Sequence, residues 1–280
     1  MNNNRCAFLM SSCDVYEDLW NPFYECLDKF WPDCPYPVYL NTEHKQYISK
    51  RDLHFQVITV NQQKQGDMTW SARFIDALHQ IDSEYIFLVL DDYFACAPVE
   101  GKYFEEVMDL MDKDESISSF QFYGTRMMNS GEVKNWEGNM DYIPLWPNGW
   151  KTHFVPTIWR KSILLKWLRP WESIWAFEGY GSARARRWPK RYSEKVFVVR
   201  QPAVYDYLWI KDCSVVINSC WLDEPEVYDF FATNGIEVDY TKRGKMTQKQ
   251  YADITIADIL KRNTLWQTIM KAFNYVRSYF

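Results

Sequence analysis

The sequence predicts an α/β fold with a mixed, mostly parallel central sheet flanked by helices, and two observations carry that prediction. The first is the unbroken apolar run at residues 85–90, which ends at two adjacent carboxylates, Asp91 and Asp92. A short run rich in β-branched and aromatic residues is typical of a strand buried on both faces. The second is the alternation of strand and helix patterns over residues 1–95, which is typical of βαβ units.

The elements of this first half follow from local patterns. Asn21 and Pro22 fit an N-cap and a first helical residue, so we expect a helix to begin there. Apolar side chains recur at helical spacing between Thr69 and Ile81, and Asp67 or Thr69 can cap that helix. Strands are expected at residues 5–10, 38–40, 55–60 and 85–90.

The second half is less regular. A helix is expected at residues 103–111 and a strand at 117–123. From 124 to about 189 the chain is rich in Trp, Gly, Pro and Asn and weakly periodic, so we expect a long irregular segment that serves as a binding loop or lid. Further strands are expected at 195–199 and 214–218, and a final helix at 259–280.

Composition bounds the class of protein. With 280 residues, 25% charged and 47% hydrophobic, the chain fits one large globular α/β domain or two small ones. A net charge of −5 argues against nucleic-acid binding. No apolar run approaches the roughly 20 residues that span a bilayer, and the start lacks the apolar core of a signal peptide. Seven cysteines without a C-x-x-C pair favour reduced thiols and a cytoplasmic location.

Asp91 and Asp92 predict a ligand site. In parallel sheets, ligands bind at the carboxyl ends of the strands. Two neighbouring carboxylates are costly there unless a cation or a hydrogen-bond network neutralises them. We therefore expect a divalent metal that holds a phosphate.

The tryptophans suggest carbohydrate. Aromatic faces pack against the C–H face of a sugar ring, but Trp more often fills core and interface volume. A carbohydrate site and a core role are therefore both kept as interpretations. Eight of the 14 Trp fall within one stretch: Trp136, Trp146, Trp150, Trp159, Trp167, Trp171, Trp175 and Trp188.

The chain resembles nucleotide-sugar glycosyltransferases of the Rossmann-like GT-A fold, especially bacterial enzymes of capsule and lipopolysaccharide synthesis. The features that carry the resemblance stand in the family's order over about 170 residues. They are the strand-loop with Ser11, Ser12 and Asp14; G-D-M-T-W-S-A-R-F-I-D-A-L; L-V-L-D-D-Y-F; H-F-V-P-T-I-W-R-K-S-I-L; and W-A-F-E-G-Y-G-S-A-R. The resemblance implies one GT-A-like domain over 1–280, with a nucleotide-sugar-binding half (1–95), an acceptor and catalytic half (96–225) and a C-terminal helical extension (226–280).

The resemblance also implies a donor site. Asp91 and Asp92 stand where the family has Asp-x-Asp on Mn²⁺ or Mg²⁺, although this chain has Asp-Asp-Tyr. Asp92 is the expected metal ligand, and Asp91 is expected on the ribose or the metal's water shell and is also counted among the catalytic residues. The nucleotide, with uridine the expected base, is assigned to Ser11, Ser12, Asp14, Asn41, Trp70, Arg73 and Asp91.

Two of these positions keep alternatives. Trp70 also lies on the apolar helix face and can equally be a core residue. Arg73 can contact a phosphate or hold Asp91, because its guanidinium matches either group.

Glu178 is the candidate general base of an inverting transfer. A carboxylate can remove the proton of an acceptor hydroxyl, and aromatic neighbours raise its pKa. The alternative is a Glu stabilised at a helix start, and Glu172 is the second candidate for the base. His153 could reach the metal or the acceptor, or be a hydrogen-bonded structural residue.

Two basic segments could meet anions. One is the run Arg184, Arg186, Arg187, Lys190 and Arg191, which could attract a diphosphate or an anionic lipid or be a solvated face. The other is the final helix, which could lie at the inner face of the membrane or pack back on the core.

We therefore expect a metal-assisted transferase that moves a sugar from a nucleoside diphosphate to a glycan or lipid-linked acceptor. One alternative is a non-catalytic carbohydrate-binding protein, which the Trp cluster would suit. A phosphohydrolase with Asp91 as nucleophile is the other, but Asp91 comes late in the chain and lacks the usual Asp-x-Asp spacing.

Overall fold

The computed structural model describes residues 5–61, 68–124, 139–146, 148–261 and 276. The chain divides into two compact units, Met1–Tyr207 and Leu208–Phe280. The expected functional boundaries at 95/96 and 225/226 stay predictions. In the described part of the chain, no helix is long and apolar enough to cross a membrane.

The first unit is built on one eight-stranded sheet with the order β3-β2-β1-β4-β7-β5-β8-β6. β3, β2, β1 and β4 are parallel, whereas β7 is antiparallel to both β4 and β5. The predicted α/β class, a mixed and mostly parallel sheet flanked by helices, is confirmed. The strands are β1 (Cys6–Ser11), β2 (Val38–Thr42), β3 (Val57–Asn61), β4 (Tyr85–Leu90), β5 (Ile117–Phe122), β6 (Asp141–Pro144), β7 (Thr157–Arg160) and β8 (Lys195–Gln201).

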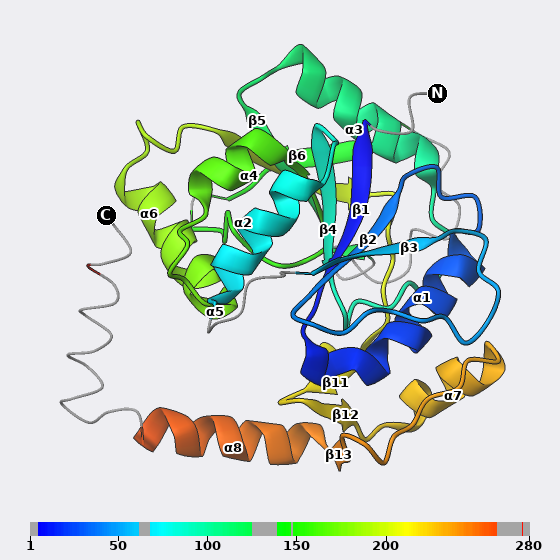
Figure 1. The fold of residues 1–280 in the computed structure, drawn as a ribbon. Coiled ribbons are helices and arrows are strands. Elements are labelled where there is room, and N and C mark those ends of the chain that lie inside the picture. The colour runs from blue at the N-terminus through cyan, green and yellow to red at the C-terminus, as the bar shows by residue number, and fades with distance from the viewer. Residues whose placement is uncertain (1–4, 62–67, 125–138, 147, 262–275, 277–280) are drawn as a thin grey trace. The chain divides into compact units, whose positions relative to one another are not determined.

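Helices cover both faces of this sheet, as Figure 1 shows. On one face, Ala7 and Leu9 of β1 belong to a buried cluster with Phe74 of α2 and Leu164 of α4. On the other face, Phe8 packs against α1, where its ring centroid lies 6.1 Å from that of Phe23. The helices of this unit are η1 (Asp14–Tyr16), α1 (Glu17–Phe30), α2 (Trp70–Gln80), α3 (Gly101–Lys113), α4 (Lys161–Trp167), α5 (Ile174–Ala176), η3 (Phe177–Gly181) and α6 (Ser182–Arg187).

Burial from both sides explains the sequence of β1 and β4. Both strands are completely or almost completely buried along their length, which only an unbroken apolar run tolerates. β4 ends at Leu90, so Asp91 and Asp92 form the turn at its carboxyl end, as predicted.

Three local predictions are refined. α1 begins at Glu17, so the expected start at Asn21 and Pro22 is wrong; Pro22 lies inside the helix, whose first turn carries Glu17 and Asp18. Thr69 caps α2 by accepting a hydrogen bond from the Ala72 amide at 3.2 Å. Asp67, the other cap candidate, lies outside the described residues.

The expected irregular segment from 124 to 189 is only partly correct. β6, β7, α4, α5, η3 and α6 lie within it. The strand β7 is short, four residues inserted between β4 and β5, so its pattern carries little periodicity.

The second unit is smaller and has its own core. The Trp221 ring lies 5.6 Å from that of Phe231 and 5.4 Å from that of Tyr240. Most of the predicted terminal helix falls outside the described residues, so its membrane contact stays a prediction. The elements are β9 (Trp209–Ile210), β10 (Cys213–Ser214), β11 (Val216–Ile217), β12 (Cys220–Leu222), α7 (Pro225–Thr233), β13 (Lys245–Met246) and α8 (Gln248–Lys261).

Candidate functional site

The site begins where the strand order reverses. β1 pairs with β2 on one side and with β4 on the other, and Ser11 is in register with Asn41 and with Leu90. α1, which follows β1, packs on one face of the sheet, whereas α2, which leads from β3 into β4, packs on the other. Such a switch point is where open α/β sheets bind ligands. Ser11, Ser12, Asn41, Asp91 and Asp92 therefore share one edge of the sheet.

Asp91 is fixed by the loop after β1. The Ser12 hydroxyl donates to Asp91 Oδ2, and the Trp20 indole donates to Ser12 Oγ at 2.7 Å. Asp91 is 8% exposed, whereas Asp92 is more open to solvent. The two carboxylates therefore differ: Asp91 is buried and held by Ser12, whereas Asp92 is partly exposed.

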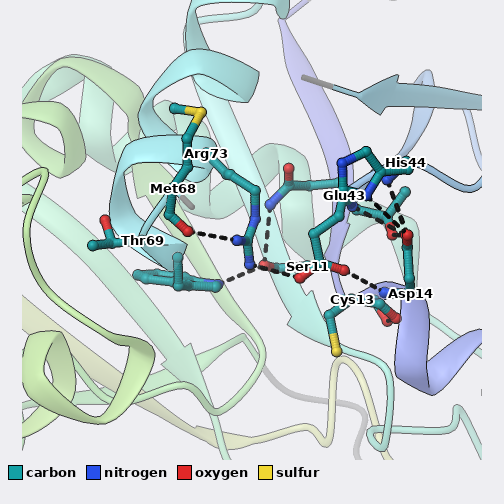
Figure 2. A network of polar contacts seen from close by, with 12 residues as sticks. Ser11, Cys13, Asp14, Glu43, His44, Met68, Thr69 and Arg73 are labelled. Carbon is teal, nitrogen blue, oxygen red and sulfur yellow. Dashed lines mark hydrogen bonds and ion pairs between the residues drawn. The ribbon is translucent and has the colours of Figure 1, made fainter. Parts of the chain in front are cut away.

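The loops after β1 and β2 brace each other. The Asp14 carboxylate accepts hydrogen bonds from the Thr42 hydroxyl at 2.7 Å and from the amides of His44 and Lys45, each at 3.1 Å. In return, the Asp14 amide donates to Glu43 Oε2 at 2.5 Å. Burial raises the pKa of Asp14, but these hydrogen bonds outweigh it and lower the pKa to about 2. The network fixes the rim of the site before any ligand arrives (Figure 2).

α2 closes this network from the other side. Arg73 donates to the Met68 carbonyl at 2.8 Å, and its second Nη lies 2.9 Å from Glu43 Oε1 (Figure 2). The Trp70 indole donates to Ser11 Oγ at 3.1 Å, and the Asn41 amide lies 3.4 Å from the same oxygen. The structure thus gathers Ser11, Asp14, Asn41, Trp70 and Arg73, all predicted for the nucleotide, into one network.

Within this network, the predicted nucleotide-binding residues differ in burial and in their partners. Ser11 and Asn41 are 3% and 2% exposed, so they position Trp70 rather than present their polar atoms to solvent. Arg73 pairs with Glu43, not with Asp91 as one alternative had it. The Arg73 side chain keeps 17% of its surface exposed.

Glu178 lies on the π-helical turn η3 and is mostly buried. Its Oε1 accepts a hydrogen bond from the Phe154 amide at 3.2 Å and lies 3.4 Å from His153 Nε2. Burial raises the pKa of Glu178, and the Phe154 amide opposes that rise. A half-desolvated carboxylate of this kind is a suitable proton acceptor.

η3 is held in place by close packing. The Thr152 hydroxyl donates to the Glu178 carbonyl at 2.8 Å and lies as close to the Ser182 hydroxyl. A Cβ at Gly181 would come within 2.9 Å of the Thr152 side chain, so only glycine lets the turn approach this closely.

Trp70 connects the two groups of residues. Its ring centroid lies 5.2 Å from that of Phe154 and 6.0 Å from that of Phe177. Phe154 donates its amide to the Glu178 carboxylate, and Phe177 precedes Glu178 in the chain. The indole that is bonded to Ser11 therefore packs on Phe154, which binds the Glu178 carboxylate, and on Phe177, the residue before Glu178.

Glu172, His153 and the acidic pair, the other predicted site residues, do not come together in one cluster. Glu172 is 2% exposed and forms a two-pronged ion pair with the fully buried Arg184, with one contact of 3.0 Å, which suits a structural role. His153 lies against Glu178 and Tyr123, whose hydroxyl is 3.2 Å from His153 Nδ1. Within the described ranges, no three His, Cys, Asp or Glu side chains group as metal ligands, so His153, Asp91 and Asp92 do not form one cluster.

Three residues of the site escaped prediction from sequence. Glu43 follows directly on the end of β2, so its place at the carboxyl edge could have been inferred from the strand. Trp20 lies in α1 and Tyr123 directly follows β5, in apolar stretches where an aromatic residue signals only core.

Comparisons with known proteins give no match in sequence, either to a protein-family model or to a curated protein. Among solved structures, S. aureus TarS 1–349 aligns at 11% identity over 72% of this chain and 60% of that one, with a TM-score of 0.42. TarS 1–349 in complex with UDP-GlcNAc aligns at 12% identity over 85% and 69%, with a TM-score of 0.43.

A third structure, the bifunctional IspDF from Campylobacter jejuni, aligns at 15% identity over 72% of this chain and 51% of that one, with a TM-score of 0.36. In the first and third alignments this chain spans less than two thirds of the other protein. The sheet order itself shows a Rossmann-like α/β fold with a mixed, mostly parallel central sheet.

Proposed function

We propose that this chain is a glycosyltransferase that takes a sugar from a nucleoside diphosphate, with uridine as the expected base, and passes it to a hydroxyl of a glycan or lipid-linked acceptor. One observation carries the proposal. Trp70 donates to Ser11, which shares the edge of the sheet with Asp91 and Asp92, and its ring packs on Phe154, whose amide binds the Glu178 carboxylate.

The donor end suits a nucleoside diphosphate. Trp70 offers an aromatic ring next to the strand ends, and Arg73 offers a guanidinium that is fixed by Glu43 and Met68. Asp14 and Glu43 hold the surrounding loops rigid, so less ordering is needed when the nucleotide binds.

The acidic pair fits a divalent cation that is shared with the diphosphate. Mg²⁺ is commonly bound by one or two carboxylates together with phosphate oxygens, so a third protein ligand is not required. Asp92, the more exposed of the pair, would be the ligand, and Asp91 would be held beside it by Ser12. Such an ion, Mn²⁺ or Mg²⁺, would neutralise the charge of the departing diphosphate.

The Glu178 carboxylate would accept the proton of the acceptor hydroxyl as that oxygen bonds to the anomeric carbon and the sugar–phosphate bond breaks. A single base on the acceptor side implies inversion at that carbon. His153 would steady the carboxylate through its Nε2, while Tyr123 holds the other ring nitrogen. Asp91 contributes to catalysis by fixing the donor end.

A carbohydrate-binding protein without turnover is the second candidate, because Trp146 and Trp150 are 43% and 48% exposed. That function would not need an acidic pair at the end of a buried strand. A phosphohydrolase is disfavoured, because the proposed nucleophile, Asp91, is buried and accepts a hydrogen bond from Ser12.

The test is release of nucleoside diphosphate from a panel of UDP-sugars, measured with and without Mn²⁺. We expect slow release that depends on Mn²⁺ and is lost in Asp92→Ala. Hydrolysis of simple phosphate esters would favour the phosphohydrolase, and sugar binding with no release from any donor would favour the binding protein.

A further inference from the structure

Four aromatic side chains form a series of contacts that reaches Glu178 through His153, and two of them are exposed. The ring of Tyr123 stacks on His153, with centroids 5.8 Å apart, and lies 6.3 Å from the ring of Trp146. The ring of Trp150 meets His153 edge-on at 6.1 Å. Trp146 and Trp150 keep 43% and 48% of their surface exposed, in contrast to the buried Trp159.

This aromatic cluster (Tyr123, Trp146, Trp150 and His153) is anchored from below by β5. The side-chain amide of the fully buried Gln121 donates to the Trp150 carbonyl at 2.9 Å. The Tyr123 hydroxyl reaches the Gln121 side-chain oxygen at 3.3 Å and His153 Nδ1 at 3.2 Å. The exposed rings therefore stand on a fixed base, and their exposure is not a sign of a loosely packed loop.

The chemistry of the cluster is mixed in a way that matches a sugar ring. A pyranose has an apolar C–H face and a rim of hydroxyl groups, so it needs an aromatic surface edged by polar groups. Trp146 and Trp150 supply the aromatic surface, while His153, the Tyr123 hydroxyl and the Glu178 carboxylate supply the polar groups. Lys151, between the two tryptophans and Glu178 in sequence, turns away to the carbonyls of Tyr192 and Glu194.

We propose that Trp146 and Trp150 form the acceptor subsite and stack a pyranose ring whose hydroxyl points toward Glu178. The inference rests on the proposed function and narrows it, because the acceptor is then recognised by a sugar rather than by a lipid chain or phosphate. An anionic headgroup at this place would meet the Glu178 carboxylate, which lies 3.4 Å from His153 within the same cluster.

The experiment is saturation-transfer NMR on the full chain with cellobiose, lactose, maltose and N,N′-diacetylchitobiose as probes. We expect at least one disaccharide to receive saturation at its ring C–H protons. Trp150→Ala should weaken that binding by about tenfold, the size of a lost aromatic contact. Trp175→Ala is the matched control, since Trp175 is 74% exposed and outside the cluster.

Absence of transfer to every disaccharide, or equal transfer in Trp150→Ala and the native chain, would overturn the proposal. Loss in Trp175→Ala alone would overturn it too, because the sugar would then bind elsewhere. UDP binding by the same samples separates the two ideas. If the protein binds UDP but no disaccharide, only the acceptor subsite is wrong. If it binds a disaccharide but no UDP, the proposed transferase function is wrong.

Discussion

Two glutamates on neighbouring turns, Glu172 and Glu178, show how the partner of a buried carboxylate decides its use. Burial raises the pKa of both, although at Glu172 the hydrogen bonds and charge of Arg184 act against that rise. Glu172 is matched by a guanidinium that is itself fully buried. Glu178 is matched by one backbone amide and a histidine, and 13% of its side chain stays exposed.

The two carboxylates differ in the cost of taking up a proton. A proton taken up by Glu172 would break a two-pronged ion pair and leave the Arg184 charge buried without its counterion. A proton taken up by Glu178 removes a desolvated charge and leaves the Phe154 amide bond largely in place. Glu172 therefore holds the fold together, and Glu178 is suited to proton transfer.

The largest expected effect is on turnover in Glu178→Gln. Loss of a general base lowers the transfer rate by about 10²–10⁴-fold, while the amide keeps the volume and one acceptor oxygen for the Phe154 amide. The measurement is transfer from the UDP-sugar that proves active, with UDP affinity and melting temperature recorded alongside. A normal transfer rate in this variant would remove Glu178 from the role of base.

Glu172→Ala should act on stability instead. Removal of one partner of a buried pair lowers the free energy of unfolding by about 3–5 kcal/mol, which urea denaturation would measure. The matched control is Glu100→Ala, because the Glu100–Lys102 pair is exposed to solvent and its loss should leave stability unchanged. If Glu172→Ala is as stable as the control, the structural role is wrong.

The pH dependence of transfer sharpens the comparison. The base must be ionised, so the rate falls as the pH falls through the pKa of Glu178. Because burial raises that pKa, the acid limb should lie above the range of an exposed glutamate, about 4.3. The residual rate of Glu178→Gln should lack this limb. An acid limb that persists unchanged in the variant would belong to another group.

The raised pKa of Glu178 also predicts a smaller effect, on the stability of the fold. At a pH between the unfolded-state and the folded-state pKa of Glu178, the folded state binds more protons at this residue than the unfolded state does. The stabilisation that comes from protonated Glu178 is therefore present at low pH and is lost as the pH rises through the folded-state pKa. The free energy of unfolding of the native chain, relative to Glu178→Gln, should therefore decrease as the pH rises across that window. Urea titrations of both proteins over this range would measure it, and an increase would contradict the assigned shift.

Asp14→Asn should give the smallest effect. The amide cannot accept the hydrogen bonds of the 42–45 turn as strongly as the carboxylate, which costs about 1–2 kcal/mol of stability at neutral pH. Because the pKa of Asp14 is about 2, its contribution is present above the unfolded pKa and lost as the pH falls through about 2. Urea denaturation of the native chain and Asp14→Asn should show a difference in the free energy of unfolding at neutral pH that vanishes at acid pH. A difference that does not change with pH would contradict the stabilising role of the Asp14 carboxylate.

The fold and the polar residues at the strand ends were predictable for one physical reason: parallel strands buried on both faces show as apolar runs, and their carboxyl ends share an edge. Ser11, Asn41 and Asp91 could therefore be placed together from the sequence. Their partners could not, because Glu43–Arg73 and Ser12–Asp91 depend on how two loops and a helix fold back over that edge.

The region around Glu178 was harder to predict from the sequence. Glu172 and Glu178 stand in similar aromatic surroundings in sequence, and only the packing of Arg184 against Glu172 separates them. The irregular segment expected from 124 to 189 hid β7 and η3, because strands and turns of a few residues carry no periodicity.

The most direct test of the account is a calorimetric titration of UDP into the native chain and into Asp92→Ala, each with and without Mn²⁺. The account predicts that the native chain binds UDP more tightly with Mn²⁺ and that the gain disappears in Asp92→Ala. Failure of the native chain to bind UDP, or equal Mn²⁺-dependent binding by both proteins, would contradict the claim that the acidic edge of the sheet holds the donor.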